Sequence, residues 1–151
     1  LAGNAPPELV ATDPSVEDAN VFALEKHLED FLVKNWNFTE LGKKYNIFEE
    51  DGELAGQQYP SDTGPIDILA ISKDNKELLV VELKRGRASD VVVGQIQRYM
   101  GFVADELTEP CQSVRGVIIA LEDDIKLRRA LSVTTNIDFY RYQVNFKLLK
   151  A

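Results

Sequence analysis

The spacing of hydrophobic and polar residues along the chain predicts an alternation of helices and strands. Residues 1–14 contain three prolines, which indicates an extended lead-in. Apolar side chains then recur at helical spacing over residues 15–36, which predicts an amphipathic helix. Glu25 is expected at the border of the apolar stripe of this helix, and Glu29 further round towards solvent. Residues 37–64 are polar and contain glycine, so we interpret them as a connection.

Two nearly continuous apolar runs, over residues 64–72 and 76–84, predict a pair of buried strands joined by a short turn. The remaining predicted elements are a helix over residues 89–107, a buried strand over 114–121, a short helix over 122–131 and a half-exposed strand over 138–148. In that last strand Tyr140 and Tyr142 belong to the apolar face, and the alternation is typical of a sheet edge. This order predicts an α/β fold, a sandwich in which helices flank a central mixed sheet.

The composition fits one compact domain over residues 15–151. A chain of 151 residues that is 44% hydrophobic can bury one core and leaves little room for a second. No run reaches the length of a membrane span, and the single cysteine, Cys111, cannot form an internal disulfide, so we expect a cytoplasmic protein. One cysteine and one histidine, His27, cannot supply the ligands of a zinc site or a Ser-His-Asp triad.

The net charge of −8 at first argues against a nucleic-acid partner, because phosphate binding requires basic side chains. The distribution of the charge changes that interpretation. Residues 1–56 hold 12 acidic and 4 basic residues, so the remaining 95 residues are neutral as a whole. Within that remainder, residues 73–98 contain six basic and four acidic residues. We therefore expect contacts with phosphate groups in this segment first.

Three charged side chains interrupt the two paired apolar runs. Successive side chains of a strand alternate between its faces, so Glu82 and Lys84 share one face, and antiparallel pairing places Asp67 across from them. Two carboxylates beside an ammonium group suit a hard cation such as Mg²⁺, whose bound water is a nucleophile for phosphodiester hydrolysis. A buried ion network that fixes the strand register is the alternative, and geometry alone does not separate the two interpretations.

Four blocks of the sequence resemble one nuclease family. Asp67, followed fifteen residues later by "ELK" at 82–84, resembles the motif of the PD-(D/E)xK superfamily, although Ile66 separates Pro65 from Asp67. The blocks "EKHLEDFL", "PIDILA", "VVELKRGRASD" and "VGQIQRYM" together resemble the NucS/EndoMS-type endonuclease domain, over roughly residues 22–147. This resemblance implies a restriction-endonuclease-like α/β/α sandwich with a central mixed sheet flanked by helices.

The resemblance also implies roles for single residues. By position, Asp67 and Glu82 would bind Mg²⁺ or Mn²⁺ with the help of the backbone carbonyl of Leu83. Lys84 would position or activate the attacking water. The residues implied at the catalytic site are Asp67, Glu82, Lys84, Gln95 and Glu25. The candidates for contact with nucleic acid are Arg85, Arg87, Arg98 and Tyr99.

Two of these assignments have plain structural alternatives. Gln95 matches a helix glutamine of the family, and the alternative is a hydrogen-bond partner for exposed backbone or side chains. Glu25 matches a glutamate of the first helix of the family, and the alternative is a solvated helix acid. For each arginine the alternative is an ordinary surface charge.

The first functional hypothesis is therefore a metal-dependent DNA endonuclease domain. The second is a catalytically silent module of the same fold that binds nucleic acid or protein through residues 73–98 and the Tyr140 and Tyr142 strand. The third is a purely structural ion network, which predicts that Mg²⁺ leaves the melting temperature unchanged. The C-terminal strand could also pair with a second copy in a homodimer. Residues 1–14 cannot be the N-terminal domain with which NucS-type enzymes bind DNA, so substrate preference is not transferred.

Overall fold

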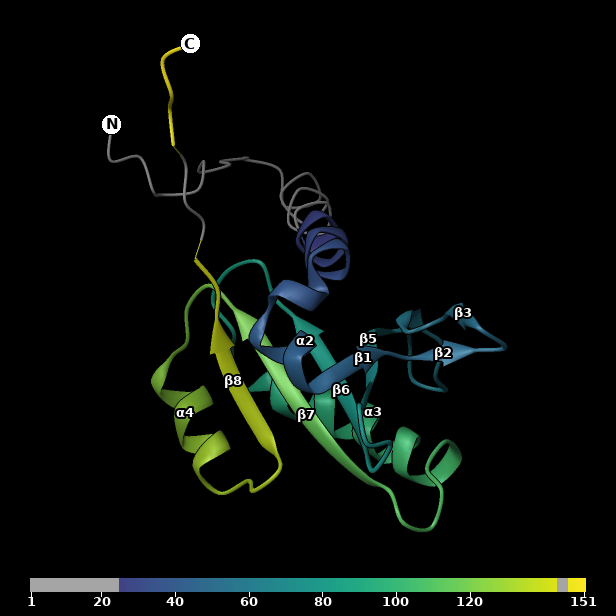
Figure 1. Ribbon diagram of the computed structural model, residues 1–151. Helices are drawn as coiled ribbons and strands as arrows, with labels where there is room; N and C mark the ends of the chain where they lie inside the picture. The colour runs from purple at the N-terminus through teal and green to yellow at the C-terminus, as the bar shows by residue number, and fades with distance from the viewer. Residues whose placement is uncertain (1–24, 144–146) are drawn as a thin grey trace.

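The computed structural model describes residues 25–143 and 147–151, and a six-stranded mixed sheet runs through its centre (Figure 1). The strands of this sheet are β1 (Tyr45–Ile47), β4 (Gln57–Tyr59), β5 (Ile66–Ser72), β6 (Glu77–Leu83), β7 (Ser113–Ala120) and β8 (Ile137–Arg141). A separate hairpin joins β2 (Glu49–Glu50) and β3 (Glu53–Leu54). The helical elements are a helix over residues 25–34, the 3₁₀ helix η1 (Trp36–Phe38), α2 (Glu40–Lys44), α3 (Val91–Glu106) and α4 (Ile125–Ser132).

The sheet combines antiparallel and parallel pairs. The order is β1-β5-β6-β7-β8, and β4 pairs with β5 as well, so that β1 and β4 share one edge of β5. β5 and β6 are antiparallel, as expected for strands joined by a short turn, whereas β6, β7 and β8 are parallel to one another. Each parallel step needs a crossover, and α3 and α4 supply the two crossovers.

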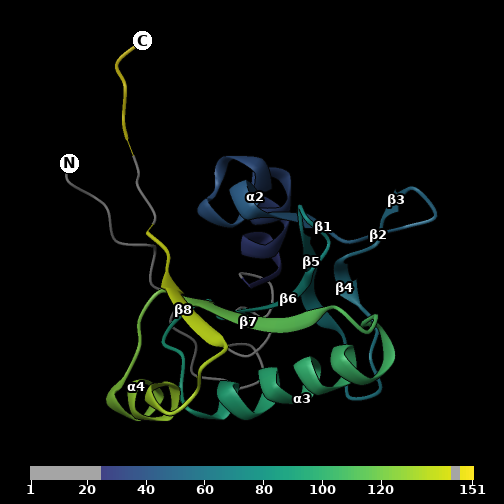
Figure 2. The ribbon, with the colours of Figure 1, turned by 60° about the horizontal axis from the view of Figure 1, so that its bottom comes forward.

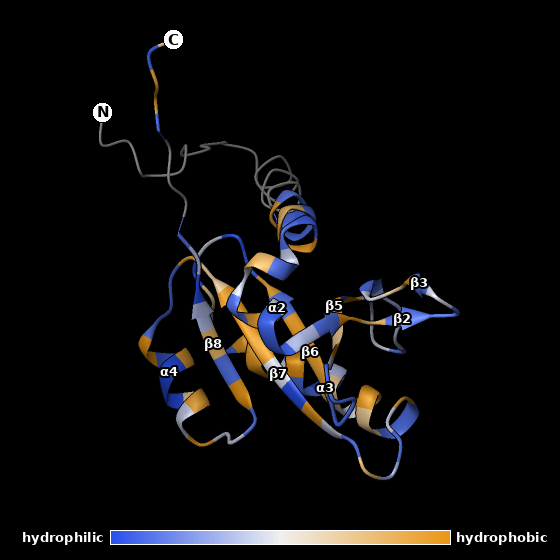
Figure 3. Ribbon diagram, viewed as in Figure 1, coloured by the Kyte–Doolittle hydropathy of each residue, from blue (hydrophilic) through white to orange (hydrophobic). Residues whose placement is uncertain are grey.

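Helices cover both faces of the sheet. Figure 2 shows α3 and α4 on one side and α2 on the other. β6 is apolar on both faces because each face meets a helical layer: Leu78 and Val80 pack in the core under α3, while Leu79 and Val81 pack with Trp36 in the core under α2. Figure 3 shows the central strands largely in the hydrophobic colour, as expected for strands buried on both faces. The predicted α/β/α sandwich with a mixed central sheet is confirmed.

The predicted connection over residues 37–64 is wrong in detail. This segment contains η1, α2 and the four short strands β1 to β4. Strands of two or three residues are too short for a period of two to show in the sequence, and they form because they pair with β5 or with each other. The indole N–H of Trp36 donates to the carbonyl of Tyr45 at 2.8 Å and holds η1 against β1.

The start of the chain cannot be compared with the prediction, and the C-terminal strand differs from it. The lead-in over residues 1–14 and the start of the first helix are outside the described residues. β8 lies at the edge of the sheet, as predicted, but it ends at Arg141, and its inward side chains are Ile137 and Phe139 rather than Tyr140. Pairing of β8 with a second copy stays a prediction. Within the described residues, no helix is long and apolar enough to cross a bilayer.

The sheet edge around Gly56 generates a first prediction. A Cβ atom at Gly56 would lie 2.2 Å from the carbonyl oxygen of Leu69 and 2.8 Å from the Ile47 side chain. Gly56→Ala is therefore expected to lower the free energy of unfolding by about 1–3 kcal/mol, the range for an added methyl in a packed region. Urea denaturation measures this. Gly101→Ala is the control, because its Cβ meets nothing within 4 Å and the exposed helix position gains about 1 kcal/mol. Equal stability of the two variants would contradict the packing argument.

Candidate functional site

The register of β5 on β6 brings the predicted carboxylates together. Ile68 pairs with Val81, so the next position along the same register places Asp67 across from Glu82. Residues directly opposite in an antiparallel pair project to the same face. The backbone N–H of Leu83 donates to Asp67 Oδ2 at 2.8 Å, which fixes this carboxylate at the strand end. The predicted convergence of Asp67 and Glu82 is present.

These two carboxylates line a cavity of about 410 Å³. The side chains around it come from the helix over residues 25–34, β4, β5, the end of β6 and α3. The lining residues are Glu25, Lys26, Glu29, Gln58, Pro65, Asp67, Glu82, Lys84, Gln95 and Tyr99. All five residues predicted for the catalytic site are therefore brought to one cavity, together with Tyr99.

Glu82 is one of two buried acids of the cavity, with 3% of its surface exposed, as for Glu29. Burial raises the pKa of Glu82 well above its ordinary value of 4.5, and the neighbouring Asp67 adds to this because it accepts a hydrogen bond from the protonated form and repels the ionised one. Among the described residues, Glu82 Oε2 is the one buried side-chain oxygen or nitrogen without a hydrogen-bond partner. Such an orphaned oxygen calls for a partner that the protein itself does not provide.

Glu25 and Lys84 both line this cavity, and their charges interact. Burial raises the pKa of Glu25, and the ammonium group of Lys84 opposes that shift. The half-buried Lys84 follows directly after β6, where its backbone N–H still donates to the carbonyl of Ile119 at 2.8 Å. The sheet therefore fixes the backbone of Lys84 while its side chain lines the cavity. Glu25 is thus half-buried and lines the cavity, and its role at a catalytic site stays a prediction.

The expectation that Glu29 faces solvent is wrong. Its side chain is 4% exposed and lines the same cavity as Glu25, one helical turn away. Two glutamine side chains of β4 donate to this carboxylate, Gln57 at 2.8 Å and Gln58 at 2.6 Å. The apolar stripe gave no sign of this burial, because the donors come from a segment that the sequence presents as a connection. The cavity residues that sequence reasoning missed are Glu29, Gln58, Lys26 and Pro65.

On α3, Gln95 and Tyr99 lie one turn apart and both line the cavity. Gln95 Nε2 donates to the Tyr99 hydroxyl at 3.4 Å. Their spacing of four residues places them on one helix face, as the sequence predicts. The amide of Gln95 therefore has its orientation fixed by a neighbour of the same helix.

The predicted arginine contacts are not gathered at this cavity. Arg87 forms an exposed ion pair with Glu122 at 3.4 Å. Arg98 lines a separate hollow with Asp62 and Phe102. Arg85 is half-buried beside the site, and its backbone carbonyl accepts a hydrogen bond from the Tyr142 hydroxyl.

The charge balance of the cavity favours a bound cation. Four carboxylates line it, from Glu25, Glu29, Asp67 and Glu82, against the two ammonium groups of Lys26 and Lys84. In the described part of the chain no three acids, histidines or cysteines form a ready-made metal cluster. Two carboxylates with an orphaned oxygen nevertheless fit Mg²⁺, which binds through one or two carboxylates and completes its shell with water and phosphate oxygens.

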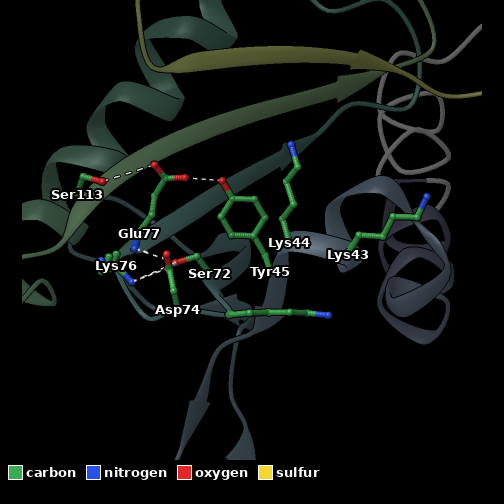
Figure 4. A pocket seen from close by; sticks show the side chains of 9 residues that line it. Lys43, Lys44, Tyr45, Ser72, Asp74, Lys76, Glu77 and Ser113 are labelled. Atoms are coloured by element: carbon green, nitrogen blue, oxygen red, sulfur yellow. Dashed lines mark hydrogen bonds between the residues drawn. The ribbon is translucent and has the colours of Figure 1, made fainter.

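A second hollow, of about 460 Å³, lies at the turn between β5 and β6 and is lined by four lysines (Figure 4). Its acids are already engaged. Glu77 accepts hydrogen bonds from the hydroxyls of Tyr45 and Ser113, and Asp74 accepts one from Ser72 at 2.6 Å. Figure 4 shows the amino groups of Lys43 and Lys44 pointing away from these acids. The hollow is therefore a solvated basic surface without converging groups.

Known proteins are similar to this chain in both sequence and fold. The family model of the endonuclease NucS C-terminal domain matches residues 24–145. The endonuclease NucS of Methanocaldococcus jannaschii is 28% identical over 104 residues, which are 69% of this chain and 35% of that protein. The endonuclease NucS of Corynebacterium glutamicum (strain R) is 35% identical over 100 residues, 66% of this chain and 37% of that protein.

Two solved structures show the same fold. A repair endonuclease from Pyrococcus abyssi matches with a TM-score of 0.59 and 20% identity, over 91% of this chain and 50% of that one. An EndoMS–dsDNA2 complex matches with a TM-score of 0.60 and 20% identity, over 93% of this chain and 49% of that one. The chain thus spans about a third of the length of the curated relatives and half that of the solved chains. Because the family model covers most of its residues, the chain belongs to the family of endonuclease NucS C-terminal domains.

Proposed function

We propose that this chain is the catalytic domain of a metal-dependent DNA endonuclease. The observation that carries the proposal is the buried, unpartnered Oε2 of Glu82 across from Asp67, in a cavity of a family whose named members are endonucleases. A solved neighbour with the same fold is described as a complex with dsDNA, which supports DNA as the substrate. A carboxylate pair that serves only as structure would have its buried oxygens paired within the protein.

Asp67 and Glu82 would hold the divalent cation, Mg²⁺ or Mn²⁺, with the backbone carbonyl of Leu83. When bound, such a cation supplies a water of lowered pKa and neutralises phosphate charge. Lys84 follows β6 two residues after Glu82, and both side chains line the cavity. Lys84 donates hydrogen bonds from its ammonium group and stabilises negative charge that develops on a phosphate in the cavity. Its backbone is anchored to β7, so this charge is held in place before substrate arrives.

Three further residues in or beside the cavity would orient water, accept a proton or contact phosphate. The amide of Gln95, fixed by Tyr99, offers a directional donor and acceptor to water or substrate. Glu25, whose pKa is raised, accepts a proton from water near neutral pH more readily than an exposed carboxylate does. Arg85, half-buried next to the site, is the arginine best placed for a phosphate that flanks the cleaved bond.

Cleavage of DNA tests the proposal directly. We expect the wild-type protein to cut supercoiled, single-stranded or forked DNA with Mg²⁺ or Mn²⁺ and not with EDTA. Lys84→Ala and Asp67→Ala should each lower the rate on the order of 100-fold or more, because the first removes a positive charge that meets the transition-state charge and the second removes a ligand of the cation. Lys126→Ala, an exposed lysine on α4, is the control and should cut like wild type. Cutting that survives in EDTA or in Asp67→Ala would refute the metal-dependent mechanism.

Metal binding also has a readout that needs no substrate. A cation that binds the folded state alone stabilises it by about 2.7 kcal/mol at one hundred times its Kd. We therefore expect Mg²⁺ or Mn²⁺ to raise the Tm of the wild-type protein and to leave the Tm of Asp67→Ala unchanged. Thermal melts with increasing metal measure this. No shift in the wild type would favour the structural ion network, whereas a shift without cleavage would favour a silent binding module.

The raised pKa of Glu82 predicts a pH dependence of stability in the absence of metal. Because this pKa lies above its value of 4.5 in the unfolded chain, the stabilisation by the neutral carboxyl is complete below about pH 4.5 and is lost as pH rises towards the folded value. We expect the Tm of the wild type to fall between about pH 5 and pH 8 relative to Glu82→Gln, which keeps a neutral side chain of similar shape. Melts in EDTA at several pH values measure the difference, and parallel curves for the two proteins would contradict it.

A further inference from the structure

Gln58 occupies the position across from Asp67 on the side opposite Glu82. β4 pairs antiparallel with β5 at Gln57 with Ile68 and at Tyr59 with Ile66, so Gln58 lies between these pairs and faces Asp67. Its Nε2 donates to Asp67 Oδ1 at 3.2 Å and to Glu29 Oε2 at 2.6 Å. An amide nitrogen carries two hydrogens, so one is available for each carboxylate.

The orientation of this amide is set by Glu29. A buried carboxylate must accept hydrogen bonds, and Glu29 accepts them from Gln58, from Gln57 at 2.8 Å and from Lys26 at 3.4 Å. If the amide of Gln58 were turned over, its oxygen would face two carboxylates at once. Glu29 therefore holds the nitrogen of Gln58 towards Asp67.

The backbone of Gln58 supports the same conclusion. Its φ is +52°, in the left-handed region that residues with a side chain seldom adopt. Backbone strain of this kind persists where the surrounding structure imposes it, and it is concentrated at functional sites. Here the strained residue is the one whose side chain joins a buried acid to the proposed metal ligand.

The hydrogen bond from Gln58 fixes the orientation of the Asp67 carboxylate. Its Oδ2 accepts the backbone N–H of Leu83 at 2.8 Å, and its Oδ1 accepts the amide of Gln58. With one donor on each oxygen the orientation of the carboxylate is fixed, and each oxygen keeps one further lone pair, for the proton of Glu82 or for a cation in its place. We propose that Gln58, held by Glu29, is a positioning residue that fixes the Asp67 carboxylate for cation binding; this inference rests on the proposed function.

Gln58→Gly tests the inference without threatening the fold, because glycine adopts positive φ freely and removes only the side chain. We expect its affinity for Mn²⁺, measured by titration calorimetry without DNA, to fall by roughly 10–100-fold, as is usual when a residue that orients a metal ligand is removed. Its Tm in EDTA should fall no further than that of Gln57→Ala, because each variant removes one donor from Glu29 and glycine relieves the positive φ. The cleavage rate at saturating Mn²⁺ should recover towards the wild-type rate, which a defect in catalysis itself would not allow.

Gln57→Ala is the matched control. Gln57 is the neighbouring glutamine of β4 and also donates to Glu29, but its second acceptor is Asp30 at 2.6 Å rather than Asp67. Its Mn²⁺ affinity should stay close to that of the wild type. If Gln58→Gly binds Mn²⁺ as tightly as the wild type, or if Gln57→Ala loses as much affinity, the positioning role is overturned while the proposed function stands. If the wild type binds no Mn²⁺, both fall together.

Discussion

The pairing of β5 with β6 is the constraint on which the site depends. Side chains alternate along a strand, so a shift of one residue would turn Asp67 away from Glu82 and move the apolar residues of β5 out of their cores. The register is held by burial on both faces, because Leu78 and Val80 belong to one core and Leu79 and Val81 to the other. The hydrophobic cores and the carboxylate pair therefore demand the same alignment, and the chain cannot satisfy one without the other.

The cavity concentrates negative charge where the protein has little water to screen it. Glu82 responds by keeping its proton in the absence of a cation, whereas Glu29 is satisfied by donors from β4 and Lys26. The two buried acids thus have different solutions to the same desolvation problem. One is fully occupied by the protein's own hydrogen bonds, and the other has an oxygen left over. That difference separates an acid that orients its neighbours from one that is available to a ligand.

The sequence was sufficient to predict the elements with long apolar runs and the residues placed on them. β5, β6 and β7 are long apolar runs and α3 has helical spacing, so Asp67, Glu82, Lys84 and Gln95 could be assigned to faces and strand ends before the fold was known. It was insufficient for residues 37–64, whose short strands exist only through pairing with β5. The role of Gln58 and the burial of Glu29 follow from that pairing, and neither has a local signature. Closeness in sequence likewise did not reveal that Arg87 would form an exposed ion pair and Arg98 would line a separate hollow. Their contact with nucleic acid stays a prediction.

The β2–β3 hairpin has a consequence for how this fold can vary. Asp51 and Gly52 both have positive φ, the conformation of a tight two-residue turn, and the four strand residues of the hairpin are exposed. The hairpin begins just after β1 and returns just before β4, and both of these strands are fixed to β5. Added length at its tip would extend into solvent without displacing β4 or its glutamines. The fold therefore offers an insertion point that can lengthen independently of the chemistry next to it.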